Sequence, residues 1–175
     1  MGRPKDELTL PDGRPFVVAV RDALAPLCAE IVVLGDRDIL PGTRRIADRV
    51  PGLGPLGGLD ALLADARGVA LVCACDQPRI TTDLLARLLD PPAPVAVFAT
   101  PDGRRHPLPL RVTDGPPRGS DPRAVLDAHL RSGRRALHEW LDAVGARTVS
   151  VSEDDAAALV GVNTPEDYDA LVAGD

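Results

Sequence analysis

The chain alternates between short apolar runs and polar segments that contain glycine and proline. The pattern predicts six strands, several of them apolar at every position, which is typical of strands covered on both faces. They cover residues 31–34, 44–47, 69–74, 95–99, 106–112 and 148–151. The 106–112 run contains two prolines, which donate no backbone hydrogen bond and therefore favour an edge strand or a bulge.

Apolar residues at helical spacing predict helices between these strands. The predicted helices cover residues 16–27, 55–66, 121–131 and 134–144, with further helices beginning near Thr82 and at Pro165. Thr82 and Thr164 are expected to cap their helices, because a threonine hydroxyl accepts a backbone N–H of the first turn. Alternating strands and helices predict a single α/β domain over 1–175, a three-layer sandwich with a mostly parallel, Rossmann-like sheet.

Composition narrows the class of protein. Hydrophobic residues make up 45% of the 175 residues but aromatic residues only 2%, so we expect a core of valine, leucine, isoleucine and alanine. A net charge of -6 argues against a nucleic-acid surface, which is normally basic. No apolar stretch approaches the ~18 residues that span a bilayer, so no membrane partner is expected.

The three cysteines, Cys28, Cys73 and Cys75, are expected to be small buried residues rather than zinc ligands, since too few further ligands lie near them. Pleating predicts that Cys73 and Cys75 point to opposite faces at the end of their strand. Cysteines of this kind favour a reduced, cytoplasmic protein.

Residues 54–78 hold the most informative pattern: a glycine-rich loop, a helix, an apolar strand and then Asp76. Ligands of open α/β sheets bind outside the carboxyl ends of the strands, where Asp76 is expected to lie. One carboxylate there suits Mg²⁺ on a nucleotide, since Mg²⁺ takes one or two carboxylates plus phosphate oxygens. Gly54 permits close approach of the backbone to a ligand. The alternative for Asp76 is a carboxylate that caps the following turn. The alternative for the glycine-rich loop is a simple turn before a helix.

Four segments then occur in an informative order: MGRPKDEL at 1–8, DRVPGLGPLGGL at 48–59, CDQP at 75–78 and VNTPEDY at 162–168. In this order they resemble the molybdenum cofactor guanylyltransferases, which are nucleotidyltransferases with a glycosyltransferase-A-like fold. HPLPL at 106–110 and GRRALHEWL at 133–141 are similar to further segments of that family. The resemblance implies transfer of GMP from GTP to the molybdenum-molybdopterin cofactor, with Mg²⁺ required and pyrophosphate released.

The resemblance also implies roles on the nucleotide side of the site. Lys5 would contact the triphosphate and Asp76 would bind magnesium, so these two residues would carry catalysis. Asp48 and Gly54 would help hold the nucleotide, and Asp36 occupies a place where relatives often carry a base-binding residue. A solvated terminal lysine is the alternative for Lys5, and a polar residue at a strand-to-loop junction is the alternative for Asp48.

On the cofactor side, Asn163 matches the second of two asparagines in the family's late motif, and Gly161 replaces the first. His106 would contact the pterin. Arg134 and Arg135 open a predicted helix, where the dipole disfavours cations, and this favours a phosphate contact for Arg135. A structural histidine and a solvated arginine are the alternatives for His106 and Arg135. Proteins that deliver the cofactor or mature molybdoenzymes are possible transient partners.

The beginning of the chain departs from the family, which opens with an apolar strand and a glycine-rich phosphate loop before the segment that contains the lysine. This chain starts at the methionine of that later segment, so we expect an N-terminally incomplete domain whose neighbouring strands have exposed edges. A downstream start assignment or a fragment would explain it. The alternative functions are a molybdopterin cytidylyltransferase, another transferase of nucleotides to phosphates, and a nucleotide-binding protein that has lost catalysis.

Overall fold

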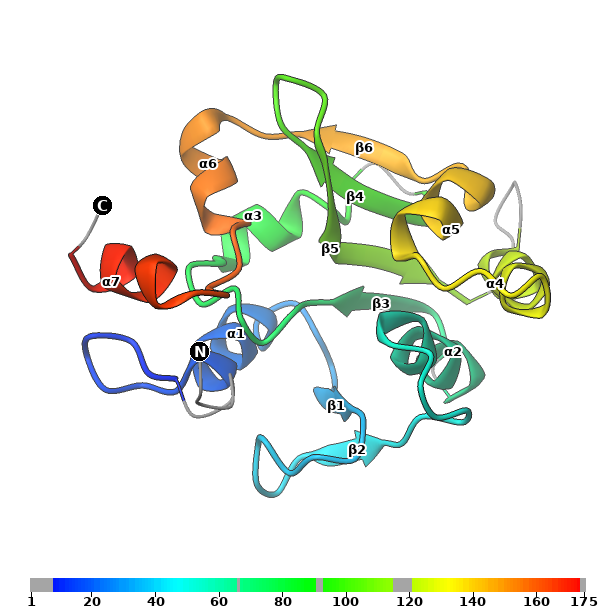
Figure 1. Ribbon diagram of the computed structural model, residues 1–175, viewed down its shortest axis with the longest axis horizontal. Helices are drawn as coiled ribbons and strands as arrows, with labels where there is room; N and C mark the ends of the chain where they lie inside the picture. Colours follow the sequence, from blue (N-terminus) through cyan, green and yellow to red (C-terminus); the bar gives the residue numbers. More distant parts are fainter. Residues whose placement is uncertain (1–7, 66, 91–92, 115–120, 174–175) are drawn as a thin grey trace.

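A computed structural model of the chain describes residues 8–65, 67–90, 93–114 and 121–173 (Figure 1). The strands are β1 (Val32–Leu34), β2 (Arg44–Ile46), β3 (Val69–Val72), β4 (Val95–Ala99), β5 (Arg105–Thr113) and β6 (Arg147–Ser150). The helices are α1 (Phe16–Leu24), α2 (Pro55–Asp65), α3 (Thr82–Ala86), α4 (Pro122–Arg131), α5 (Leu137–Val144), α6 (Glu153–Ala158) and α7 (Pro165–Ala173). Across these described ranges no helix combines the length and apolar character that crossing a membrane requires.

The strands form two sheets. β1 and β2 are parallel, and a four-stranded sheet has the order β3-β5-β4-β6. β5 is antiparallel to both β3 and β4, whereas β4 and β6 are parallel, so β5 alone in this sheet runs against the others. The predicted α/β fold with a mostly parallel sheet is confirmed.

The prolines of β5 favour an edge strand or a bulge, and the structure shows a bulge in a central strand. β5 lies between β3 and β4, and its register with them leaves residues 107–109 without partners in either ladder. The register with β4 shifts at Val97/Phe98, which is the bulge that the prolines favoured. Pro107 and Pro109 thus lie where no backbone N–H is needed.

The helix boundaries carry two corrections. Thr81 rather than Thr82 caps α3, because the Thr81 hydroxyl accepts the Leu84 N–H (3.2 Å) while the Thr82 hydroxyl donates to the carbonyl of Ala23 (2.9 Å). Helix α5 begins at Leu137, three residues later than expected. The Thr164 cap of α7 is confirmed, since its hydroxyl accepts the Asp167 N–H at 3.1 Å.

Helices cover both faces of the sheets (Figure 1). On one face, α2, α4 and α5 pack against β3, β4 and β5 around the fully buried Trp140 and Leu126. On the other face, Phe98 packs with Leu84 and Leu88 of the α3 region. The core is mainly aliphatic, as its composition predicts.

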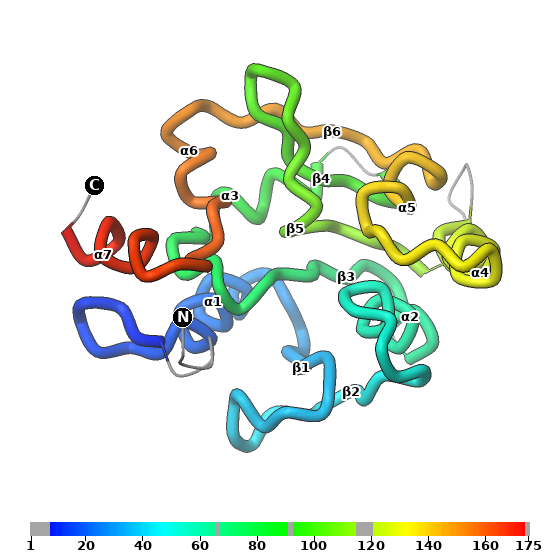
Figure 2. The backbone as a smooth tube through the Cα atoms, viewed as in Figure 1, coloured from blue at the N-terminus to red at the C-terminus, as the bar shows by residue number. Residues whose placement is uncertain are grey.

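The first described residues and the last helix lie side by side (Figure 2). Tyr168 of α7 donates from its hydroxyl to the carbonyl of Thr9 (3.1 Å), and its ring centroid lies 6.3 Å from that of Phe16. Leu8 packs with Phe16, Val162 and Leu171 in one apolar cluster. This cluster places the late motif beside the beginning of the described chain.

Candidate functional site

Asp76 lies in the loop after β3 and is half-buried. Its backbone carbonyl accepts a hydrogen bond from the N–H of Val162 (2.8 Å). Its carboxylate lies against Gly161, where an added Cβ would stand 3.1 Å from Oδ1. Asp76 and Gly161 are 85 residues apart in the sequence, and their contact brings the CDQP segment beside the VNTPEDY segment.

Asn163 approaches the same glycine. Its Nδ2 donates to the carbonyl of Gly161 (2.9 Å) and would stand 3.0 Å from a Cβ added there. A Cβ at either distance would force a neighbour to move, so the glycine lets both side chains approach the backbone. Gly161, which stands where the family has an asparagine, therefore allows a close approach that a residue with a side chain would hinder.

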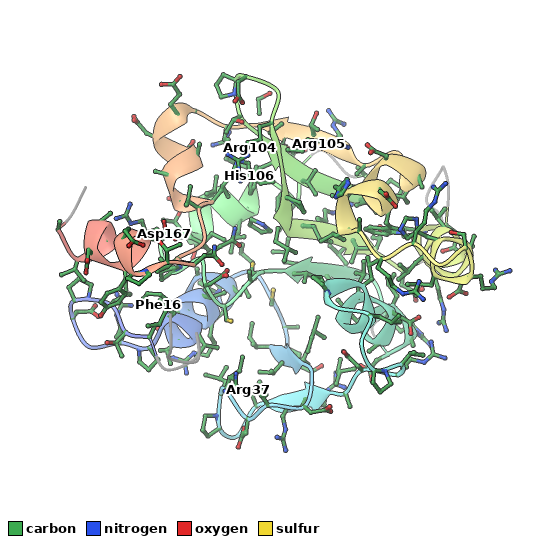
Figure 3. All side chains as sticks on the ribbon, in the orientation of Figure 1. Phe16, Arg37, Arg104, Arg105, His106 and Asp167 are labelled. Atoms are coloured by element: carbon green, nitrogen blue, oxygen red, sulfur yellow. The ribbon has the colours of Figure 1, made fainter. Side chains whose placement is uncertain are left out.

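Asp167 fixes the backbone that carries Asn163. Its Oδ2 accepts the N–H groups of Asn163 and Thr164, both at 2.8 Å. These backbone hydrogen bonds lower the pKa of Asp167 below its ordinary value, because they favour the charged carboxylate. Asp167 lies above Phe16 in Figure 3, where α7 meets α1. The start of α7 is thus a capped, reciprocal turn that holds the asparagine in place.

Gln77 is a supporting residue to which the sequence analysis assigned no role. It is buried, and its Nε2 donates to the carbonyls of Leu108 (3.0 Å) and Leu159 (2.7 Å). It therefore ties the Asp76 loop to β5 and to the end of α6. The available signal was an amide that directly follows Asp76, just after the apolar run 69–75.

His106 lies on β5 beside Arg104 and Arg105 (Figure 3). Burial, and then the positive charge of Arg104, lower the pKa of His106. Its Nε2 is buried and finds no hydrogen-bond partner among the described residues. The ring is therefore neutral near pH 7 and has an unused nitrogen, which suits a ligand contact as well as a structural position.

Asp48 follows β2 and lies beside the first turn of α2. Its Oδ2 would stand 2.9 Å from a Cβ added to Gly57, so this glycine is needed for the close approach. A carboxylate there lies at the positive end of the helix dipole. Gly54 precedes α2 with a φ of +58°, and its carbonyl accepts the Gly57 N–H at 2.9 Å. The glycine-rich loop and Asp48 are thus one local unit.

The remaining expected residues lie apart from these contacts or outside the described ranges. Asp36 is exposed after β1, and its backbone carbonyl accepts from Nη1 of Arg45 (3.2 Å). Arg135 lies between α4 and α5, where Nη1 donates to the carbonyls of Leu130 (3.0 Å) and Arg134 (2.7 Å). It thereby satisfies a carbonyl at the end of α4. Lys5 lies outside the described residues.

The fit of a metal depends on Asp76. Within the part of the chain that the structure describes, no three histidine, cysteine, aspartate or glutamate side chains gather as a metal cluster. A metal held at Asp76 would take its other ligands from phosphate and water, which is the ligand set that Mg²⁺ prefers. The half-buried carboxylate at the carboxyl end of β3 fits this kind of site.

Comparison with known proteins identifies the family. The model of the MobA-like NTP transferase domain matches residues 1–150. The chain belongs to the MobA-like NTP transferases. It is therefore a nucleotidyltransferase, and the expected fold and enzyme class are both confirmed.

Curated relatives of this MobA-like chain carry one recurring name. The chain is 33% identical over 174 residues to the molybdenum cofactor guanylyltransferase of Xanthomonas euvesicatoria pv. vesicatoria (strain 85-10). The match covers 96% of this chain and 86% of that protein. The chain is 35% identical over 160 residues to the probable molybdenum cofactor guanylyltransferase of Chloroflexus aggregans (strain MD-66 / DSM 9485), covering 86% and 76%.

Solved structures support the fold of this MobA-like chain. Molybdopterin-guanine dinucleotide biosynthesis protein A from Archaeoglobus fulgidus matches with a TM-score of 0.75 at 17% identity, covering 98% of this chain and 90% of that one. The 2-C-methyl-D-erythritol 4-phosphate cytidylyltransferase from Thermus thermophilus matches with a TM-score of 0.71 at 20% identity, covering 97% and 93%.

Proposed function

We propose that the protein transfers GMP from GTP to the molybdenum-molybdopterin cofactor. The observation that carries the proposal is the convergence of Asp76 and Asn163 on Gly161 at the carboxyl end of β3. Relatives of 33% and 35% identity bear the name of this activity, which favours guanine over other bases. The reaction belongs in the cytoplasm, where GTP is supplied.

The proposed step is an in-line displacement at phosphorus. A terminal phosphate oxygen of the cofactor attacks the α-phosphorus of GTP, and the bond from this phosphorus to the bridging oxygen of pyrophosphate breaks. Asp76 holds Mg²⁺, which when bound neutralises charge on the triphosphate. Lys5 contributes a second positive charge to the leaving pyrophosphate.

The other residues bind and orient the two substrates. Asp48, Gly54 and Asp36 hold the nucleotide, while Asn163, His106 and Arg135 face the cofactor. Bringing two anionic phosphates together in line is the main task of such a site, since positioning supplies a large part of the rate. Proteins that deliver the cofactor or receive the product are transient partners in this proposal.

Two other functions differ from the proposed one, the first in the nucleotide that is bound and the second in the absence of catalysis. A cytidylyltransferase acting on the same pterin would select CTP. This candidate is retained because a solved cytidylyltransferase has the same fold. A nucleotide-binding protein without catalysis would bind GTP and release no pyrophosphate.

The test is the midpoint of thermal unfolding with Mg²⁺ plus GTP and, separately, with Mg²⁺ plus CTP. A ligand at ~100 times its dissociation constant adds ~2.7 kcal/mol to the free energy of unfolding, which gives a clear shift. A shift with GTP alone supports the proposal, and a shift with CTP alone supports the cytidylyl alternative. Pyrophosphate release on adding the cofactor then separates the enzyme from a binding protein.

A further inference from the structure

The bulge in β5 changes the face of the sheet on which its first residues lie. In the register with β4, Leu110 lies opposite Val97 and His106 lies opposite Phe98, so one step along β4 corresponds to four residues of β5. Residues directly opposite each other share a face, whereas the neighbours Val97 and Phe98 point to opposite faces. His106 therefore lies on the other face from Leu110, although an even number of positions separates them. A bulge can re-aim a side chain in this way.

The face on which His106 lies is also the face of the candidate site. Phe98, the partner of His106 in the ladder, packs there with Leu159 at the end of α6. Two residues after Leu159, Gly161 lies against the carboxylate of Asp76. The bulge thus places His106 on the side of the sheet where the proposed metal ligand and the late motif meet.

Arg104 shares this face with His106. Side chains alternate along an extended chain, so Arg104 and His106 lie on one face and Arg105 on the other. Arg105 forms an ion pair with Asp142 of α5, which covers the opposite face. The positive charge of Arg104 is, after burial, a cause of the lowered pKa of His106, so the guanidinium acts directly on the ring. Figure 3 shows the two side chains beside one another.

The hairpin fixes the backbone of Arg104 and leaves its guanidinium unused. The carbonyl of Arg104 accepts the N–H of Thr100 (3.0 Å), and the N–H of Arg104 donates to Asp102 (3.1 Å), which also accepts the Thr100 hydroxyl. The exposed guanidinium forms no hydrogen bond or ion pair with any residue that the structure describes. Nε2 of His106 likewise has no partner in the described ranges, although it is buried. Two neighbouring side chains thus have nitrogen atoms available for a ligand.

We propose that Arg104 and His106 bind the terminal phosphate of the cofactor, whose oxygen attacks GTP. This inference rests on the proposed function, because it assigns a binding site to the second substrate of that reaction. A guanidinium offers two parallel N–H groups to phosphate oxygens, and a neutral imidazole protonated at Nε2 adds one further donor. The pair therefore suits the dianion of a phosphate monoester, which has three oxygen atoms as acceptors.

The place of this pair in the fold favours the attacking phosphate over the triphosphate. Asp48 and Gly54, which we propose for the nucleotide, lie between β2 and α2, whereas Arg104 and His106 belong to the hairpin of β4 and β5. β3, which ends shortly before Asp76, lies between the β1–β2 pair and β5 (Figure 1). The two substrates thus approach the proposed metal ligand from opposite sides, which suits in-line displacement.

The kinetic test compares Arg104→Gln with Arg105→Gln, which removes the same charge from the opposite face of the same hairpin. Pyrophosphate release is measured with the cofactor varied at saturating GTP, and with GTP varied at saturating cofactor. We expect Arg104→Gln to raise the KM for the cofactor at least tenfold without changing the KM for GTP, and Arg105→Gln to change neither. Arg104→Lys keeps the charge but loses the paired donors, so it should recover only part of the loss.

Three kinetic results would overturn the proposal. They are an unchanged KM for the cofactor in Arg104→Gln, an equal increase of this KM in both glutamine variants, and an increase confined to the KM for GTP. The last result would assign Arg104 to the triphosphate.

A binding measurement separates this inference from the proposed function. The chain has three histidines, so the NMR signals of His106 can be followed during a titration with phenyl phosphate, a phosphate monoester that lacks the pterin. We expect the signals of His106 to move and those of His129 and His138 to stay. The affinity for phenyl phosphate should fall at least fivefold in Arg104→Gln and stay unchanged in Arg105→Gln.

The two failures are therefore distinguishable. A response of His106 to phenyl phosphate in a chain that releases no pyrophosphate would support the phosphate site and contradict the transfer of GMP. Pyrophosphate release by a chain in which His106 does not respond would support the transfer and overturn the phosphate site.

Discussion

The carboxylate of Asp76 lies against the backbone of Gly161, so close that a methyl group on this glycine would stand 3.1 Å from Oδ1. This contact joins the end of β3 to the segment before α7. Asn163 lies against the same glycine, and Asp167 holds the backbone of Asn163 in place. The metal-binding and cofactor-facing parts of the proposed site are thus mechanically linked.

Asp76→Asn tests the metal role. We expect kcat/KM with Mg²⁺ and GTP to fall at least 100-fold, which corresponds to ~2.7 kcal/mol of transition-state stabilisation. The unfolding midpoint should hardly change, because asparagine has the same shape. Pyrophosphate release and thermal unfolding measure the two effects, with the exposed Asp83→Asn as control. Near-normal turnover of the Asp76 variant would contradict the assignment.

Gly161→Ala tests the close contact itself. The new methyl group would displace the Asp76 carboxylate or the Asn163 amide by a few tenths of an ångström. Since both side chains can rotate, we expect a change of less than about 1 kcal/mol in the free energy of unfolding. Turnover should nevertheless fall about tenfold. Val160→Ala, an exposed neighbour, should alter neither quantity, and an unchanged rate in the glycine variant would count against a shared site.

Gln77→Glu tests the support of the Asp76 loop. The carboxylate cannot donate to the carbonyls of Leu108 and Leu159, so both lose their partner. We expect a loss of at least about 2 kcal/mol in the free energy of unfolding, measured by urea denaturation. Gln77→Met separates the lost hydrogen bonds from the added charge and should lose less. Stability equal to that of the parent chain in both variants would show that this amide contributes nothing.

Asp167→Asn tests the cap of α7 through its pH dependence. The pKa of Asp167 is lowered in the folded state, so its contribution is fully present above the unfolded value of ~3.9 and is lost as the pH falls through the folded pKa. The parent chain should therefore be more stable than the variant at pH 6, and the difference should vanish at lower pH. Urea midpoints from pH 3 to 6 measure it, with Asp169→Asn as control. A difference that is independent of pH would refute the cap.

Gly57→Ala tests the position of Asp48. The added Cβ would stand 2.9 Å from Oδ2, so the carboxylate must move. Alanine also favours the helix by ~1 kcal/mol, so we expect little net change in stability but about fivefold weaker GTP binding by calorimetry. In Gly58→Ala the new Cβ would lie 3.3 Å from Cβ of Leu34 but 3.9 Å from Oδ1 of Asp48, so Leu34 rather than Asp48 must shift and this variant should keep its affinity. Equal GTP affinities of the two variants would contradict a role of Asp48 in binding the nucleotide.

Much of this fold follows from local patterns. Apolar runs predict β1 and β4, and the Thr164-Pro165 pair predicts α7, because burial and capping are properties of neighbouring residues. The prolines indicated an edge or a bulge in β5 but could not decide between them. The ladder on each side depends on distant strands, which the local sequence does not specify. Thr81 and Thr82 both suit a cap, and only the nearby Ala23 carbonyl decides between them.

The candidate site was predictable to a similar degree. Ordered motifs placed Asp76 and Asn163 among the candidate residues, but their meeting at Gly161 depends on how β3 and α7 pack. Gln77 escaped notice because its two acceptors lie 31 and 82 residues away in the chain. Arg135 has a hydrogen-bonding role at the end of α4 that its motif did not suggest.

The separation of the β1–β2 pair from the larger sheet has a dynamic consequence. No backbone hydrogen bond of a ladder within the described ranges connects this pair to β3, so it should open locally as one cooperative unit. Its amide protons should exchange with solvent sooner than those of β4 and β5. Asp36 and Asp48 follow these two strands, whereas Asp76 is held by Val162 and the Gln77 loop. Warming should therefore disturb the backbone beside Asp36 and Asp48, which we propose as nucleotide-binding residues, before it disturbs Asp76, the proposed metal ligand.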